Sequence, residues 1–195
     1  MAKLVSKIYG DALFQTAMEE GRLDEFFAQA KTVKEILGEH GELFKLIDEP
    51  KIDREEKQKI LETIFGGKIA DELTGLFLLL VEKGRFKDTG RVLEYFLLRV
   101  KEEKKIGIAK VVSAMELTDG QKTKIEKRLL ETTMYVSFEV EYLVNPSLIG
   151  GLTIQIGDRI VDGSIRTKLE KLAGVLRNIQ VGGEEGKQKR GEMVP

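Results

Sequence analysis

Apolar residues recur every three or four positions through the first hundred residues of the chain, and this spacing predicts amphipathic helices. Glycine, proline and helix-capping residues interrupt the pattern at intervals suited to short helices. The predicted helices occupy residues 4–18, 24–37, 43–47, 54–65, 73–81 and 89–105. The sequence therefore predicts a bundle of five to six helices over residues 1–105.

The spacing changes near Lys105, where alternation of apolar and polar residues replaces the helical pattern. Helices are predicted after Thr118 and over residues 165–179, and the chain is expected to reverse at Gly157–Arg159 in a hairpin. The strands are predicted at residues 106–112, 136–142, 152–156 and 160–161. These segments predict a smaller domain of β-strands and two helices over residues 106–181, followed by a flexible polar tail, 182–195. The expected fold class is α+β with two domains.

Two short motifs mark expected helix starts. Asp53 is followed three residues later by Glu56, and Thr118 is followed in the same way by Gln121. In a capping box, the first side chain accepts a hydrogen bond from an amide of the first turn, and the second accepts one from the amide of the cap residue. Each motif predicts a helix that begins at the residue after the cap.

Composition and charge narrow the classes of protein to which the chain can belong. Its 195 residues are 42% hydrophobic, which is enough to build a buried core. Residues 1–105 hold 19 basic and 21 acidic side chains, and the remainder holds 13 and 12, so neither half has the basic excess of a nucleic-acid-binding surface. No apolar run approaches the roughly 20 residues that span a bilayer. We expect no nucleic-acid partner and no insertion into a membrane.

Residues capable of catalysis or metal binding are scarce. The chain has no cysteine and one histidine, His40, which lies near a predicted helix end where a solvated role is expected. This inventory provides neither a zinc site nor a catalytic triad. The glycines before Lys68 and Lys187 lack the spacing of a phosphate-binding loop. The sequence predicts no metal, no cofactor and no catalysis, and it leaves open a small metal-independent hydrolase that uses a carboxylate pair with raised pKa values.

Two predicted helices carry apolar residues around most of their circumference. The fifth helix has an unbroken apolar run from Leu76 to Val81. The first helix has a broad apolar face made of Leu4, Val5, Ile8, Tyr9, Ala12 and Leu13. Such helices either lie at the centre of a bundle or leave a groove for the amphipathic helix of another protein. Periodicity alone leaves both possibilities open.

The stretch over residues 145–169 is the most distinctive in the chain. It contains an apolar residue, a double glycine, an alternating strand, and an Asp-Gly-Ser sequence that opens a basic helix. This order resembles the signature of the delta subunit family of F-type ATP synthase, the bacterial counterparts of the mitochondrial oligomycin-sensitivity protein. The residues that match this signature are Gly150, Gly151, Asp162, Gly163 and Ser164. The resemblance covers all of the chain except its final residues.

The resemblance implies a non-catalytic stator subunit that holds a catalytic head to a peripheral stalk while a rotor turns. The implied partners are the N-terminal helix of an alpha subunit and the C-terminal ends of the b subunits. It also implies a monomer, present in one copy per complex and located peripherally at the cytoplasmic face of the cell inner membrane. A helical binding protein unrelated to ATP synthase is the alternative.

The resemblance further implies which residues bind each partner. The alpha-subunit helix is expected in a groove between the first and fifth helices, formed by Leu4, Ile8, Tyr9, Ala12, Leu13, Leu73, Phe77 and Leu80. The b subunits are expected on the second domain at Leu148, Ile149, Ile165, Leu169 and Leu172. For this second set, the alternative is that the apolar side chains form the core of the domain itself.

Overall fold

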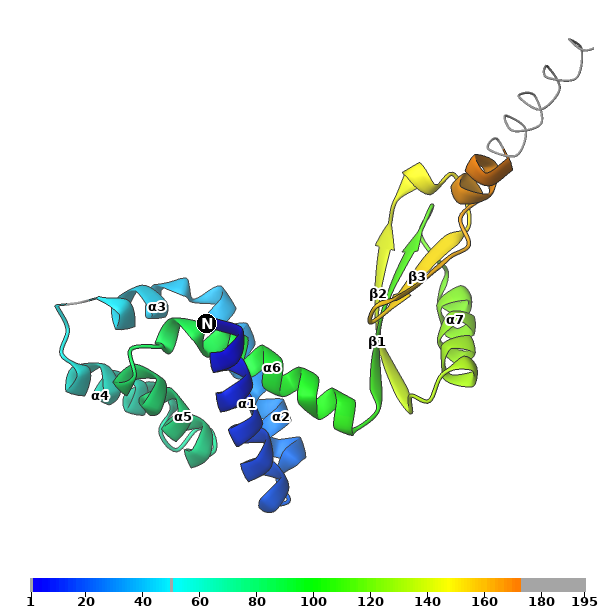
Figure 1. Ribbon diagram of the computed structural model, residues 1–195. Helices are drawn as coiled ribbons and strands as arrows, with labels where there is room; N and C mark the ends of the chain where they lie inside the picture. The colour runs from blue at the N-terminus through cyan, green and yellow to red at the C-terminus, as the bar shows by residue number, and fades with distance from the viewer. Residues whose placement is uncertain (1, 50, 173–195) are drawn as a thin grey trace, which may run out of the picture. The chain divides into compact units, whose positions relative to one another are not determined.

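The computed structural model describes residues 2–49 and 51–172 of the chain (Figure 1). The chain divides into two compact units, Met1–Lys104 and Lys105–Pro195, which we call the helical unit and the sheet unit. Helices build the first unit and a sheet with helices builds the second, so the predicted α+β class is confirmed. The predicted tail, 182–195, and the final helix beyond residue 172 lie outside the described residues.

Six α-helices and one short 3-10 helix make up the helical unit within the described residues. Their bounds are α1 (Ala2–Glu19), α2 (Leu23–Glu39), α3 (Gly41–Asp48), α4 (Arg54–Phe65), α5 (Asp71–Glu82), η1 (Phe86–Asp88) and α6 (Thr89–Glu103). Each helix that apolar spacing predicts is present. Gly21 and Gly84 have φ values of 66° and 62°, a conformation that glycine adopts without strain, and they let the chain turn after α1 and α5.

The core of the helical unit is a continuous cluster of apolar side chains. Phe26 of α2, Phe77 of α5 and Phe96 of α6 are fully buried within it. Burial of each such side chain contributes about 1.5–3 kcal/mol. The buried positions of α5 are Leu73, Thr74, Leu76, Phe77, Leu80 and Val81. The all-round apolar character of α5 is therefore explained by its central position in the bundle.

The sheet unit contains four strands in the described residues, with the spatial order β2-β1-β3-β4. Its elements are β1 (Ile106–Ser113), α7 (Asp119–Thr132), β2 (Ser137–Val144), η2 (Pro146–Leu148), β3 (Leu152–Ile156), β4 (Arg159–Asp162) and a helix over residues 165–172. β1 and β2 are parallel and α7 connects them, whereas β3 is antiparallel to both β1 and β4 (Figure 1). Ile156 pairs with Arg159, which confirms the predicted hairpin.

One face of the sheet packs against α7. The hydroxyl of Tyr142 on β2 donates to Oε1 of Glu126 on α7 at 3.0 Å, and Val111 on β1 is fully buried on the same face. Val161 of β4 belongs to this face by its register with β3, but it is 63% exposed. The cover that α7 provides thus extends over β1 and β2 and leaves β4 open.

The two edges of the sheet are formed by β2 and β4. Along β2, the exposed residues Glu139 and Glu141 alternate with half-buried apolar residues. β4 is only 4 residues long, and all of them are exposed.

The two predicted helix caps have different outcomes. α7 begins at the expected residue, and Oε1 of Gln121 accepts from the Thr118 amide at 2.9 Å, so the predicted capping box is confirmed. α4 also begins at the expected residue, but Asp53 makes no side-chain cap hydrogen bond, so the capping box predicted there is wrong. Asp53 and Glu56 are both exposed, and water can satisfy the free amides of that turn instead.

Candidate partner-binding surfaces

The eight residues expected to line a groove between α1 and α5 differ in how far they are buried. Four are buried in the core of the helical unit, namely Leu13, Leu73, Phe77 and Leu80. Tyr9 is partly buried against the same core. Leu4 and Ile8 are 62% and 54% exposed, and Ala12 is also exposed. Burial removes the first four from any surface groove in this conformation. We call Leu4, Ile8 and Ala12 the α1 stripe.

Contacts with α6 fix the rotation of α1 about its own axis. The ring of Tyr95 on α6 lies so close to Gly10 that a Cβ added there would be 2.5 Å from Tyr95 Cδ1. The Tyr95 hydroxyl donates to Oδ1 of Asp11 at 3.0 Å. Burial and this neighbouring carboxylate together raise the pKa of Tyr95. Gly10 and Asp11 therefore define the side of α1 that faces α6.

Ile8 and Ala12 point away from Gly10, and so from the Tyr95 ring that lies against it. At 100° per residue, both point about 160° away from Gly10, whereas Ile8 lies about 60° from Asp11 and Ala12 about 60° from Tyr9. α1 contacts both α5 and α6 (Figure 1). The α1 stripe therefore occupies the exposed side of α1, with Leu4 and Ile8 nearer to Asp11 and Ala12 nearer to the partly buried Tyr9. On α5 itself, the exposed positions among the small and apolar residues are Gly75 and Leu79.

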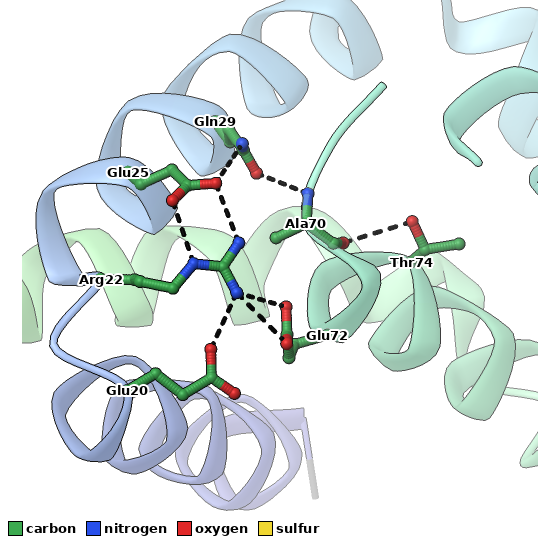
Figure 2. A network of polar contacts seen from close by, with 7 residues as sticks. All are labelled: Glu20, Arg22, Glu25, Gln29, Ala70, Glu72 and Thr74. Carbon is green, nitrogen blue, oxygen red and sulfur yellow. Dashed lines mark hydrogen bonds and ion pairs between the residues drawn. The ribbon is translucent and has the colours of Figure 1, made fainter. Parts of the chain in front are cut away.

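A network of charged side chains ties the start of α2 to the start of α5 (Figure 2). The Arg22 guanidinium donates to Glu25 at 2.9 and 3.0 Å and to Glu20 at 2.9 Å, and it reaches Glu72 of α5 at 3.4 Å. The hydrogen bond from Arg22 lowers the pKa of Glu25, and the hydrogen bond to Glu25 does most to raise the pKa of Arg22. Arg22 thus links the α1–α2 turn to the first turn of α5.

Gln29 strengthens the same connection (Figure 2). Its side-chain oxygen accepts from the amide of Ala70, the residue before α5, at 2.7 Å, and its amide nitrogen donates to Glu25 at 3.2 Å. The Arg22 and Gln29 contacts together hold α5 at a set distance from α2. No sequence pattern pointed to this network, since its members lie on segments far apart in the chain.

Two hollows open beside α2 on the surface of the helical unit. One, of about 490 Å³, lies between α2 and α6 and has Phe27 and Leu97 among its lining residues. The other, of about 480 Å³, lies between α2 and α4 and is lined mainly by apolar side chains such as Ile36, Ile64 and Ile69. None of the eight residues predicted for the alpha-subunit groove lines either hollow.

In the sheet unit, Ser164 caps the helix over residues 165–172, because its Oγ accepts from the Thr167 amide at 3.3 Å, and Asp162 supports this cap. The Oδ1 of Asp162 accepts from the Ser164 amide at 2.8 Å, and its Oδ2 accepts from the Thr167 hydroxyl at 2.7 Å. These hydrogen bonds, with that from Thr167 the strongest influence, lower the pKa of Asp162 to about 2. The Asp-Gly-Ser part of the signature therefore has a structural role, which is to start this helix at a fixed place after β4.

The double glycine of the signature allows the backbone to approach this helix closely. Gly151 has a φ of 78°, and a Cβ added to it would lie 2.4 Å from the carbonyl oxygen of Gly163. The carbonyl of Gly150 accepts from the Ile165 amide at 2.9 Å, and a Cβ at Gly150 would lie 2.6 Å from Ile165 Cδ1. Together with the Ser164 cap and its support from Asp162, these contacts form what we call the signature joint between the sheet and the helix.

The apolar residues expected to meet the b subunits lie at the surface around the signature joint. Leu148 is half-buried. The other four are 66%, 44%, 51% and 60% exposed in the order Ile149, Ile165, Leu169 and Leu172. Within the described residues these four side chains are not buried in a core.

The described residues contain few groups that could bind a metal ion or catalyse hydrolysis. They contain no group of three or more His, Cys, Asp or Glu side chains placed to hold a metal ion. In this part of the chain, the carboxyl groups with a clearly shifted pKa are Glu25, Glu82 and Asp162, and hydrogen-bond donors lower all three. A hydrolytic carboxylate pair needs one raised pKa instead. Among the described helices, none combines the length and the apolar character that crossing a bilayer requires.

Comparison with known proteins adds independent evidence. The model of the ATP synthase delta (OSCP) subunit family matches residues 5–176 of the chain. The chain is 46% identical over 182 residues to ATP synthase subunit delta of Lachnoclostridium phytofermentans, covering 93% of this chain and 100% of that protein. It is 33% identical to ATP synthase subunit delta of Halalkalibacterium halodurans, covering 86% of this chain and 92% of that protein.

A solved structure shares the fold. A chain of the mitochondrial ATP synthase hexamer of Toxoplasma gondii aligns with a TM-score of 0.69 over 88% of this chain and 96% of that chain, at 21% identity. The family match and the sequence relatives disfavour both the unrelated binding protein and the hydrolase. This chain belongs to the ATP synthase delta (OSCP) subunit family, and it is a non-catalytic stator subunit of the peripheral stalk of an F-type ATP synthase.

Proposed function

We propose that the helical unit of this stator subunit binds the N-terminal helix of an alpha subunit along the seam between α1 and α5, and that the sheet unit binds the C-terminal ends of the b subunits. One copy of the subunit then holds the catalytic head to the peripheral stalk against the torque of the rotor. In this proposal the subunit is located peripherally at the cytoplasmic face of the cell inner membrane.

The α1 stripe is the observation that carries the first part of the proposal. Leu4 and Ile8 remain 62% and 54% exposed, although the core beside them is complete. Residues at this spacing lie on one side of a helix, and an amphipathic partner helix binds such a surface through anchors at similar spacing. Gly75 on α5 leaves room for the partner, because an added Cβ there would have no atom within 4 Å.

Preorganisation supports the same proposal. The contact between Gly10 and Tyr95 fixes α1, and the contact between Arg22 and Glu72 fixes α5, so both sides of the seam are in place before a partner arrives. A surface that is already ordered loses less conformational entropy on binding, and this favours affinity. A stator contact needs slow release, and differences in affinity between related interfaces lie mostly in the dissociation rate.

For the sheet unit, the exposed side chains at Ile165, Leu169 and Leu172 support binding of the b subunits. Their spacing of four and three residues places them on one side of the helix. The signature joint holds the start of this helix against β3 and β4, so its apolar side has a defined position in the unit.

The alpha-subunit contact can be tested by titrating a peptide of the alpha-subunit N-terminus into the full-length protein in a calorimeter. Ile8→Asp is expected to weaken binding about tenfold or more, because it places a carboxylate in the middle of the apolar contact. Leu98→Asp is the matched control, since Leu98 on α6 is 44% exposed and lies outside the seam. Phe77 is unsuitable for this purpose, because it is fully buried and a charge there unfolds the core.

Two outcomes would contradict the proposal for the helical unit. One is an absence of saturable binding to the native protein. The other is an equal loss of affinity in Ile8→Asp and Leu98→Asp, which would show that the effect of the charge does not depend on the seam. Circular dichroism of both variants confirms that the fold is unchanged.

A further inference from the structure

Ile149 has a backbone conformation that a β-branched residue rarely adopts. Its φ is 66° and its ψ is −37°. At this positive φ the Cβ of an L-residue crowds its own backbone, and the negative ψ lies outside the left-handed helical region that asparagine tolerates, so glycine is the usual residue there. Among the described non-glycine residues, only Lys105 shares a positive φ, at 53°.

The surroundings of Ile149 explain why the backbone takes this course. The Ile149 amide donates to the carbonyl of Pro146 at 3.1 Å, which closes the turn of η2. On its other side, Gly150 and Gly151 belong to the signature joint and lie against Ile165 and Gly163. The chain is therefore constrained before and after Ile149. It has glycine at the two positions where a side chain would clash, and isoleucine at the position next to them.

The Ile149 side chain contributes little packing energy to the sheet unit, because it is 66% exposed. A strained conformation persists where the surrounding structure over-determines it, and such residues gather at functional sites. A glycine at this position would remove the strain. An exposed isoleucine therefore indicates a role for the side chain outside the unit itself.

The position of Ile149 makes it part of a larger apolar surface. Ile165 packs against Gly150, the residue after Ile149, and it begins the row that continues through Leu169 and Leu172 along the helix. We call these four exposed side chains the signature patch. Ile149 lies at the end of the patch nearest the sheet, on the rigid backbone of the signature joint.

Basic residues flank the signature patch. Residues 165–172 contain Arg166, Lys168 and Lys171 against the single acid Glu170. Glu170 accepts from Arg166 at 2.9 Å, so these two charges neutralise each other within the helix. Lys168 and Lys171 carry the remaining positive charge, and the patch is thus an apolar row with a positive border. A helix with carboxylates on either side of an apolar row complements it.

We propose that Ile149 is the anchor of the signature patch, held outward by the strained backbone, and that the patch binds an amphipathic helix with acidic residues beside its apolar row. The proposal rests on the proposed function of the sheet unit, in which this helix comes from the b subunits. An anchor fixed on a rigid backbone loses little freedom on binding, which is the property of hot-spot residues at the centre of interfaces.

The test compares Ile149→Gly with Ile160→Gly in the full-length protein. Both positions hold an isoleucine with similar exposure, 66% and 64%, but Ile160 lies on β4 and is absent from the positive-φ residues. The probe is the soluble C-terminal segment of the b subunits of the same enzyme, titrated by calorimetry at rising ionic strength. Amide hydrogen exchange of β3 in the free protein is the second readout.

We expect Ile149→Gly to weaken binding of the b segment about tenfold or more while β3 amides exchange about fivefold or more slowly, because the strain is relieved. Ile160→Gly should leave binding unchanged and should not slow exchange. Native binding should weaken as salt is added. These opposite effects of one substitution on affinity and stability distinguish an anchor from a structural residue.

Each part of the proposal has its own contrary result. If the native protein binds the b segment and Ile149→Gly binds equally well, the anchor role is overturned while the proposed function stands. Faster exchange in Ile149→Gly overturns the strain, and affinity that is insensitive to salt overturns the acidic partner. If the native protein does not bind the segment at all, the proposed function of the sheet unit fails and the inference fails with it.

Discussion

The helical unit and the sheet unit differ most in how much apolar surface each buries by itself. Among the described residues, 22 buried apolar residues lie in the helical unit and 3 in the sheet unit, namely Ala109, Val111 and Leu129. Large exposed apolar residues show the reverse order, with 7 in the helical unit and 14 in the sheet unit. The helical unit thus has a complete core beside one exposed stripe, whereas the sheet unit has much of its apolar surface still uncovered.

This contrast bears on how each unit meets a partner. Binding to a complete unit adds an interface to a fold that is already stable. Binding to a sparsely packed unit also stabilises the unit itself, because a partner that binds only the folded state shifts the folding equilibrium. We infer that the stability of the sheet unit depends on assembly more strongly than that of the helical unit.

The largest expected effect is the loss of a core aromatic residue from the helical unit. Phe77→Ala should destabilise the protein by about 3–5 kcal/mol, because a fully buried ring is replaced by a cavity. Ile160→Ala in the sheet unit should change stability by no more than about 0.5 kcal/mol, since that side chain is 64% exposed. Urea unfolding followed by circular dichroism measures both. Similar losses in the two variants would remove the contrast between the units.

An intermediate effect is expected where α1 meets α6. Gly10→Ala should destabilise the helical unit by about 1–3 kcal/mol, because the new Cβ would displace the Tyr95 ring and disturb its hydrogen bond to Asp11. Gly75→Ala is the matched control within a helix of the same unit. It has open space around the added methyl group and should stabilise the protein by about 1 kcal/mol. Destabilisation by both substitutions, seen in the same urea assay, would argue against close packing at Gly10.

The smallest expected effect is a pH dependence confined to the signature joint. The pKa of Asp162 is lowered from 3.8 to about 2 by hydrogen bonds to its ionised form, so this carboxylate stabilises the fold above about pH 4. That contribution is lost as the pH falls toward 2 and the carboxylate takes up a proton. Carbon NMR of the Asp162 carboxyl should give a midpoint near 2, and Asp162→Asn should abolish the acid-dependent change at Ser164. A midpoint near 4 would mean that the Asp162 hydrogen bonds are not formed in solution.

Features set by residues close in sequence could be predicted from the sequence. The helices, the alternating strands and the hairpin at Gly157 all follow from local spacing and turn chemistry. Helix caps show the limit of such rules. The pairs Asp53–Glu56 and Thr118–Gln121 look alike in sequence, and both helices begin where expected, yet the predicted side-chain hydrogen bonds are found only at the second. All four side chains are exposed, so neither exposure nor the local sequence pattern separates the two caps.

Features set by distant residues could not be predicted. The α1 stripe was part of a broad apolar face, and the contact of Gly10 with Tyr95, far along the chain, decides which part of that face is buried. The same limitation applied to α5, whose all-round apolar sequence gave no means of separating buried Phe77 from exposed Leu79. The backbone of Ile149 depends on a joint that closes only when the final helix meets the sheet.

The edges of the sheet have a consequence for the subunit before assembly. A free copy exposes the outer backbone of β2 and β4, and unpaired strand edges can recruit other chains into fibrils. Glu139 and Glu141 place negative charge along the β2 edge, and the 4 residues of β4 offer too short a template for stacking. These two features lower the tendency of a free copy to pair edge to edge with other chains before it joins the enzyme.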